Sequence, residues 1–499
     1  MSLNVRNYNN KEALLFPARI GDYLSKNHLA LVIDDVVDHL DLNCLYKKVS
    51  CVGNPSYHPK MMLKILFYGY ATSNFSSRKI AKGLETDVAF IFLSGMQKPD
   101  FRTISDFRKN NVAELPTLFI QIVRLCKKLG LVGLGHLSLD STVIKANASR
   151  DATYDRERLN LEEQAIHKKI KEHLDAAQSI DDEEDRIFGP ALRGDEIPDE
   201  LGSRERRLQR IQEAKKKLEE ESLKQLNLTD PDAVFQGKRN HPKKPGYRAE
   251  VAVDEKEQIV IACNVVNKTN DTEELLPLLE QVTDNVPEAF LKESIALTAD
   301  SGYSSMQNLK ELKLKNCIDA YIPDGKYQAN QNGNLTDEDS SFHAKHFTYN
   351  PTKDVFICPN HKELIFSYKT TDDKGNRLSR YRCKECHSCK YFGRCTKSLH
   401  GRQIKVYDDI HLIRDMRKKL DTPAGKRTYA RRKAIVEPAL GNIKHNLGFR
   451  QFLLRGLKKV KGEFSLMAIV HNIKKIAKFL RELLFFKLPK ANLIPLPAT

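Results

Sequence analysis

Three acidic residues, far apart in the chain, occupy positions where their carboxylates can take part in chemistry. Asp140 and Asp300 each close a short apolar run, at residues 136–140 and 295–300. Such runs, bounded by polar residues, predict buried strands, and an acid that ends one lies near the rim of a sheet, where a ligand can reach it. Glu437 lies much later, in a segment rich in cations. These three carboxylates are the first candidates for a shared chemical site.

Two aspartates and a distant glutamate are a sensible minimum for holding two divalent metal ions. Phosphodiester chemistry needs an in-line attack on a crowded, negatively charged phosphorus. Two Mg²⁺ ions about 4 Å apart can activate the incoming oxygen and stabilise the leaving one. Mg²⁺ prefers carboxylate oxygens and water as ligands. The pattern predicts a nucleic-acid-cutting enzyme, although a single strand-end aspartate is more often a turn or helix cap.

Cations surround Glu437. Lys433 precedes it by four residues and Lys444 follows it by seven, so all three would share one face of an unbroken helix. Pro438 disfavours helix in the residue before it, which predicts a kink or a helix start at Glu437. One interpretation is a metal-bound carboxylate beside cations that grip phosphate, and the alternative is a structural ion pair.

The bulk composition favours an anionic partner and an intracellular setting. The chain has 499 residues, enough for several domains, and 82 Lys plus Arg against 65 acids give a net charge of +17. Charge alone does not choose DNA over RNA or an anionic membrane. Neither a signal peptide nor an apolar stretch long enough to span a bilayer is visible, so we expect a soluble, intracellular protein with no membrane partner and with reduced cysteines.

A cluster of cysteines is the second candidate site. Five of the ten cysteines lie in one short segment: Cys358, Cys383, Cys386, Cys389 and Cys395. Their C-x-x-C-x-x-C spacing is typical of metal knuckles, and Zn²⁺ takes four Cys or His ligands in closed sites that fold small loops. His361 adds a further ligand candidate. Structural zinc, reduced free thiols and an iron–sulfur cluster all stay open, because spacing alone does not fix the ligand set.

Periodicity divides the chain into five parts. Residues 1–130 read as short helices, with Pro59 and Ser76 marking helix starts. Exposed Arg and Lys on these helices suit a DNA-binding domain, and a plain helical bundle is the alternative. Residues 151–245 are dense in charge and predict a helical hairpin broken at Gly189-Pro190.

The α/β part is predicted to be discontinuous in sequence. Residues 141–147 continue the first strand, and residues 247–254 and 259–266 give a β-hairpin signal. Helix and strand patterns then alternate, which predicts a mixed sheet with flanking helices. The catalytic unit is assigned to residues 131–150, 246–330 and 405–456. A Cys-rich insertion at residues 331–404 and a C-terminal amphipathic helix and tail at residues 457–499 complete the chain.

Short motifs, taken in order, resemble those of DDE transposases of bacterial insertion sequences. The first-aspartate motif is matched by residues 139–149 and the second by residues 298–303. The glutamate region is matched by residues 435–456. The segments at residues 57–59 and 103–108 resemble the helical domain that precedes many of these catalytic domains.

This resemblance implies an α/β fold with an RNase H-like mixed sheet, preceded by an all-α N-terminal domain and interrupted by the charged helical and Cys-rich insertions. It implies that Asp140, Asp300 and Glu437 bind Mg²⁺ or Mn²⁺ and that the enzyme cuts and joins DNA at the ends of its element. The implied partners are the terminal inverted repeats, the target DNA and further copies of the chain, in a homodimer or larger synaptic complex. The resemblance also implies that the protein is cytoplasmic and associated with the nucleoid.

The match departs from the family pattern beside the glutamate. Many relatives carry Tyr-x-x-Arg-x-x-x-Glu followed by Lys seven residues on, but here Lys433 stands in the Arg position. Tyr429 and Arg432 keep their mutual spacing one residue early. Lysine keeps the charge but loses the bidentate phosphate geometry of arginine. The candidate phosphate-binding residues are therefore Arg432, Lys433, Lys444 and Tyr303.

Two other functions remain open at this stage. An RNase H-like nuclease or resolvase would use the same acids for hydrolysis only. A non-catalytic DNA-binding descendant is the second alternative, and the presence of all three acids argues against it.

Overall fold

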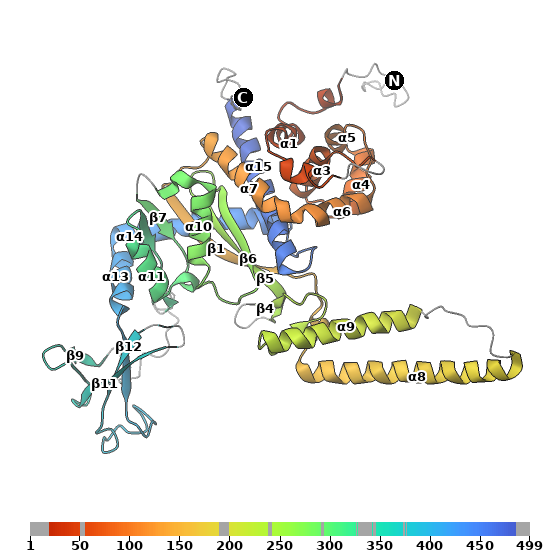
Figure 1. Cartoon of the computed structure of the whole chain (residues 1–499). Helices are drawn as coiled ribbons and strands as arrows, with labels where there is room; N and C mark the ends of the chain where they lie inside the picture. The colour runs from red at the N-terminus through yellow and green to blue at the C-terminus, as the bar shows by residue number, and fades with distance from the viewer. Residues whose placement is uncertain are drawn as a thin grey trace, which may run out of the picture.

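The computed structural model describes residues 19–49, 55–188, 199–237, 242–290, 294–325, 346–372 and 377–485, with residues 327, 342 and 375. Helices and two main β-sheets form a mixed α/β molecule with an all-helical region at its N-terminal side (Figure 1). No helix in the described part of the chain has both the length and the apolarity needed to cross a membrane.

The N-terminal region consists of short helices. These are α1 (Leu29–Asp38), α2 (Asn43–Tyr46), α3 (Pro59–Ala71), α4 (Ser77–Thr86), α5 (Val88–Ser94), α6 (Phe101–Asn111) and α7 (Leu115–Lys128). Pro59 begins α3, as predicted, and the ring of His58 accepts the backbone N–H of Lys60 as the N-cap. Ser76 precedes α4, but its side chain makes no capping bond. Nearly every residue of α3 is buried, so α3 is the centre of this region.

The central sheet changes from antiparallel to parallel pairing at β1. Its strands are β1 (His136–Lys145), β4 (Val234–Gln236), β5 (Lys244–Asp254), β6 (Val260–Val266), β7 (Ile295–Thr298) and β8 (Ile318–Tyr321). The order is β4-β5-β1-β7-β8, with β6 also paired to β5. The predicted hairpin is β5–β6, and β5 pairs antiparallel with β1. On the other side of β1, β7 and β8 are parallel to it and to each other.

Helices from the second half of the chain cover this sheet. They are α10 (Leu275–Asn285), α11 (Met306–Leu314), α13 (Ile410–Asp421), α14 (Pro423–Gly441) and α15 (Leu457–Phe485). α14 packs on β1, β5, β7 and β8, whereas α10 contacts β5 and β6. α15 contacts β6 together with α1, α3 and α7, so it lies between the sheet and the N-terminal helices (Figure 1). α15 is thus a core-packing helix, as its apolar spacing predicts.

The charged segment forms two long helices, α8 (Arg156–Phe188) and α9 (Asp199–Glu220), which lie side by side and extend away from the body (Figure 1). The predicted break at Gly189-Pro190 lies outside the described residues. The two helices share a small core: Leu159, Ile211, Ala214, Leu218, Leu226 and Leu228. Short strands β2 (Thr153–Tyr154) and β3 (Leu226–Asn227) pair at the base.

The cysteine-rich segment forms a separate antiparallel sheet that projects from the body (Figure 1). Its strands are β9 (Thr348–Asn350), β10 (Val355–Ile357), β11 (Glu363–Thr371), β12 (Arg377–Arg382) and β13 (Gln403–Tyr407), in the order β13-β12-β11-β10-β9. α13 follows β13 directly, so this sheet is inserted between the β7–β8 half of the central sheet and α14.

The contact between α15 and the N-terminal region leaves no room for a side chain at Gly462. A Cβ there would stand 2.0 Å from the carbonyl oxygen of Val112, whereas one at Gly441 in α14 would meet nothing within 4 Å. We expect Gly462→Ala to cost about 1–3 kcal/mol through overpacking. Gly441→Ala is the matched control and should be neutral or slightly stabilising, because alanine is the better helix former. Thermal unfolding followed by circular dichroism checks this, and equal melting temperatures would contradict the packing.

A buried histidine in α15 makes stability depend on pH. His471 is fully buried, its Nε2 lies 2.8 Å from the carbonyl oxygen of Gln258, and burial lowers its pKa from 6.5 to about 4. A lowered pKa means that the folded state holds the neutral ring. Its contribution to stability is therefore full above pH 6.5 and is lost as the pH falls toward 4. We expect His471→Gln to flatten the fall in melting temperature across this window. The exposed His39→Gln is the control, and parallel curves for the two variants would refute the assignment.

Candidate active site

Asp140 and Asp300 lie at matching positions on neighbouring strands. Ser138 of β1 is in register with Thr298 of β7, and the two strands are parallel. Each aspartate follows its member of this pair by two residues, and paired strands lie about 4.8 Å apart. The negative charge of Asp300 helps to raise the pKa of Asp140, which agrees with two carboxylates that are close in space. The structure therefore brings the first two predicted acids together.

Asp140 stands in the middle of β1 rather than at a strand end. The strand runs on to Lys145, as residues 141–147 predicted, and the carboxylate reaches solvent from the face of the sheet beneath α14. Its Oδ1 accepts the N–H of Ser141 at 2.8 Å, and its Oδ2 accepts Nη1 of Arg432 at 3.0 Å. Burial raises the pKa of Asp140, and the Arg432 charge opposes that rise. The guanidinium thus favours the ionised acid.

Asp300 follows the end of β7, as predicted, and begins a tight 3₁₀ turn at residues 301–303. Its Oδ1 accepts the N–H of Gly302 at 2.8 Å. A Cβ on Gly302 would stand 3.0 Å from Oδ1 of Asp300 and 2.9 Å from Oδ2 of Asp271. Glycine is required here because two carboxylates close in on this position.

Asp271 is a further acid at the site, which the sequence pattern did not single out. Its Oδ2 accepts the Ser141 hydroxyl at 3.1 Å, and its Oδ1 lies 2.5 Å from Nη1 of Arg248. Burial raises the pKa of Asp271, the Arg248 charge lowers it, and the Asp300 charge raises it. Asp271 lies in the loop between β6 and α10, and a polar run there gave no strand-end signal.

Tyr303 is not available to bind phosphate. It is fully buried, and its hydroxyl donates to Oε2 of Glu250 on β5. Burial, followed by the negative charge of Asp271, raises the pKa of Glu250 to about 9, so this carboxyl is protonated at neutral pH. The predicted contact between Tyr303 and DNA is therefore wrong. The ring fills the core behind the aspartates instead.

Of the candidate cations, Arg432 is the one that reaches the aspartates. It lies on the buried face of α14, and its carbonyl oxygen accepts the Ser138 hydroxyl at 3.3 Å, which fixes the helix against β1. Tyr429, one turn earlier, is half-buried, and the charges of Asp300 and Asp140 contribute to raising its pKa after burial itself. Tyr429 and Arg432, which stand one residue earlier than the family motif places them, therefore both face the site.

Glu437 and Lys433 lie on the exposed side of the same helix. Five residues separate Glu437 from Arg432, which is a rotation of about 140° around a helix. Within the described residues Glu437 makes no hydrogen bond or ion pair, either with the two aspartates or with another residue. The structure thus brings Asp140 and Asp300 together, while Glu437 lies on the flank of the helix that covers them.

α14 runs on through Pro438 to Gly441, so Glu437 lies inside the helix and not at a helix start. A π-helical turn, Asn442–Asn446, follows directly after the end of α14. Lys444 on this turn donates to Oγ1 of Thr142 at 2.8 Å and to the Val143 carbonyl oxygen at 3.2 Å. Thr142 points to the same face of β1 as Asp140, so Lys444 borders the site.

The donors at this site suit a hard divalent ion. Asp140 and Asp300 offer carboxylate oxygens, which Mg²⁺ and Mn²⁺ prefer. Across the described parts of the chain, no three His, Cys, Asp or Glu side chains are already arranged as ligands of one ion. The two aspartates fit as a pair, and a third ligand requires a side chain to turn toward them.

Comparisons with known proteins point the same way as the motifs. A family model described as "Transposase DDE domain" matches residues 357–477, and one described as "Transposase domain (DUF772)" matches residues 18–110. No curated protein matches the sequence. A solved structure that matches is "Cryo-EM structure of piggyBac transposase synaptic complex with hairpin DNA". Its identity is 12%, the match covers 97% of this chain and 88% of that one, and its TM-score of 0.32 is too low to relate the folds. On the two family models, the chain resembles DDE transposases of the insertion-sequence type.

Proposed function

We propose that this protein is a DNA transposase of an insertion sequence, which cuts and joins phosphodiesters at the ends of its element. The observation that carries the proposal is the parallel pairing of β1 with β7, which sets Asp140 and Asp300 each two residues beyond the Ser138–Thr298 pair, with the Arg432 guanidinium bonded to Asp140. The change from antiparallel to parallel pairing at β1 supports an RNase H-like sheet. The matched transposase models cover residues 18–110, before Asp140, and residues 357–477, which include Arg432 and Glu437.

We assign Asp140, Asp300 and Glu437 as ligands of two Mg²⁺ or Mn²⁺ ions. Such ions, when bound, activate the attacking oxygen and stabilise the leaving one. Support for the aspartates comes from their register and from their shared electrostatic field. Support for Glu437 comes from its motif, which lies inside the matched DDE segment, rather than from a contact.

Arg432 favours the ionised form of Asp140 and positions its carboxylate. Two half-buried carboxylates repel one another, and the guanidinium offsets this repulsion until a cation or a substrate arrives. Its side chain keeps about a tenth of its surface exposed, so a phosphate at the site can reach it. Lys444 donates to Thr142, which lies two residues beyond Asp140 on the same face of β1. The lysine therefore supplies a second positive charge for the phosphate backbone. Lys433, on the exposed side, suits a contact farther from the reacting bond.

The proposed partners are the terminal inverted repeats and the target DNA, held by a homodimer or larger synaptic complex. The net charge of +17 supports a polyanionic partner. We place DNA recognition in the N-terminal helices, where one of the transposase models matches.

Removing either aspartate tests the site directly. We expect Asp140→Asn and Asp300→Asn to lower cleavage of an element end by roughly a thousandfold or more, because each removes a negatively charged ligand. Binding of the same DNA should persist. Asp284→Asn, an exposed change on α10, is the control and should cleave normally. Gel assays with Mg²⁺, Mn²⁺ or chelator measure the effect. Full cleavage by Asp300→Asn would remove that residue from the site.

A second pair of variants decides whether Glu437 or Asp271 is the third metal ligand. Glu437→Gln should abolish cleavage like the aspartate variants if Glu437 is the third ligand. Asp271→Asn should weaken cleavage by about 10–100-fold and raise the metal concentration needed, because Asp271 positions Ser141, the neighbour of Asp140, without being a ligand. A metal titration of both variants checks this. The reverse ranking would make Asp271 the third ligand.

Strand transfer distinguishes a transposase from a nuclease of the same fold. DNA that already carries a free 3′-hydroxyl at the element end should be joined to a second duplex by the wild-type chain. Joined products on a denaturing gel are the expected result. Hydrolysis without joining would favour a nuclease or resolvase.

A further inference from the structure

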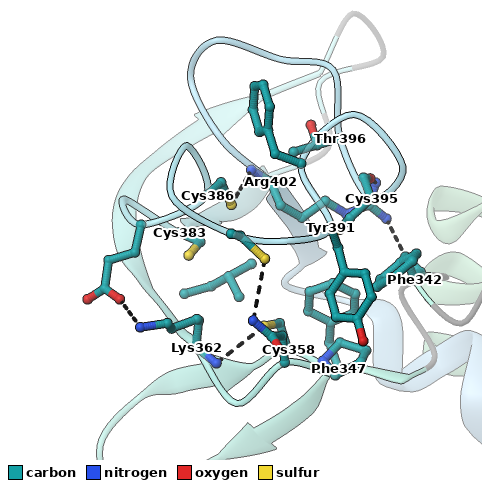
Figure 2. A pocket seen from close by; sticks show the side chains of 16 residues that line it. Phe342, Phe347, Cys358, Lys362, Cys383, Cys386, Tyr391, Cys395, Thr396 and Arg402 are labelled. Atoms are coloured by element: carbon teal, nitrogen blue, oxygen red, sulfur yellow. Dashed lines mark hydrogen bonds and ion pairs between the residues drawn. The ribbon is translucent and has the colours of Figure 1, made fainter.

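The five clustered cysteines converge on one small cavity, far from the aspartates in the fold. Cys358 follows β10, whereas Cys383, Cys386, Cys389 and Cys395 lie in the loop between β12 and β13. All five line a cavity of about 20 Å³, which is room for a single small ion or water (Figure 2). Figure 2 shows the sulfur atoms of Cys358, Cys383 and Cys386 approaching this space from opposite sides. All five are free thiols rather than disulfides.

Three N–H groups, from residues that also line the cavity, donate to these sulfur atoms. The backbone N–H of Lys362 donates to Sγ of Cys358 at 3.3 Å, and that of Arg402 donates to Sγ of Cys386 at 3.2 Å. The side-chain amide of Asn360 donates to Sγ of Cys389 at 3.4 Å (Figure 2). Such donors stabilise negative charge on sulfur and orient it, which is what the outer shell of a metal–thiolate site provides. Neutral packed thiols have no need of three separate N–H donors.

Tight turns hold the first of these thiols in place. Residues 358–362 form a closed turn in which the N–H of Cys358 donates to the Lys362 carbonyl at 2.9 Å. The N–H of His361 donates to the Cys358 carbonyl at 2.8 Å, and His361 itself has a φ of 56°. A non-glycine residue in the left-handed region is uncommon and has a local cost. The backbone strain at His361 is thus part of the closed turn that holds Cys358 beside the cavity.

A second turn is pressed against the C-x-x-C loop. The N–H of Cys383 donates to the Arg402 carbonyl at 3.1 Å, and the N–H of Cys389 donates to the Cys386 carbonyl at 3.1 Å. Gly401, with a φ of 79°, lies so close that a Cβ would stand 2.3 Å from the Cys383 carbonyl oxygen. Backbone therefore packs on backbone around the cavity, in a loop with no regular secondary structure to support it.

The apolar core of this sheet is small. Its buried members are Phe347, Leu364, Tyr381, Cys383, Cys386 and Ile404. Two of the six are thiols that line the cavity. Small units with few core residues usually need a disulfide or a metal as a staple.

We propose that this cavity binds one structural Zn²⁺ ion through four cysteine thiolates, three of which are Cys358, Cys386 and Cys389. Cys383 or Cys395 supplies the fourth. Four sulfur ligands in C-x-x-C spacing select zinc among the common divalent ions. In the described residues no three of these sulfurs already stand as ligands of one ion. Binding therefore draws the sulfurs that already line the cavity closer together by rotation about χ1, while the turns keep the backbone in place.

Metal content of the full-length protein tests the proposal. Protein purified without an affinity tag from zinc-supplemented cells should carry about one Zn²⁺ per chain by elemental analysis. Cys358→Ser, Cys386→Ser and Cys389→Ser should each lose it. Cys44→Ser, outside the cavity, and Asp300→Asn, at the other site, should keep it. Zinc-free wild type, zinc retained by Cys358→Ser, or bound iron with visible absorbance would each overturn the proposal.

A second measurement uses wild-type protein, so it tests the proposal even if the cysteine variants fail to fold. Wild-type protein treated with a chelator should become sensitive to proteolysis within residues 347–407, and added Zn²⁺ should restore resistance. Alkylation should label the cavity cysteines only after zinc is removed. Unchanged cleavage and labelling with and without chelator would contradict a zinc site. None of these readouts depends on DNA cleavage, so their failure leaves the proposed transposase activity untouched.

Discussion

The parallel pairing of β1 with β7 is the constraint on which the site depends. It sets Asp140 and Asp300 at the same level, one strand apart, in a partly buried position. Two carboxylates so placed repel each other, and burial raises the pKa of Asp140, with the charge of Asp300 adding to that rise. The Arg432 guanidinium on α14 offsets this, and α14 is held on the sheet by the bond from Ser138 to the Arg432 backbone. Register, helix packing and charge are therefore coupled at one point.

Behind this pair lies a buried polar network on the other face of the sheet. Glu250 stands opposite Ser141 in the β1–β5 pairing, and Asp271 accepts the hydroxyl of Ser141. The Glu250 carboxyl is kept protonated by burial, so it adds no further negative charge. The Arg248 charge balances Asp271. Acids on the two faces thus differ in their partners: Asp140 is paired with Arg432 of α14, whereas Glu250 and Asp271 are bonded to Tyr303, Ser141 and Arg248.

Much of this could be predicted from the sequence, because apolar periodicity and short motifs are local signals. The β5–β6 hairpin, the strand before Asp300 and the apolar face of α15 follow from spacing alone. The role of Tyr303 could not be predicted, because it depends on Glu250, which lies 53 residues earlier and meets it only in the folded sheet. Asp271 was missed for the same reason. The helix through Pro438 shows tertiary packing overriding a local preference, since Val436 and Ala439 on either side of Glu437 and Pro438 are fully buried against the sheet.

The central claim is that Asp140 and Asp300 bind the catalytic metal ions together. Anomalous scattering from Mn²⁺ in crystals of the chain with an element-end DNA tests this most directly. The account predicts an Mn²⁺ peak between the two carboxylates, about 2.2 Å from an oxygen of each, with Glu437 turned toward it. Mn²⁺ bound between Asp271 and Asp300, with Asp140 still paired to Arg432 alone, would contradict it.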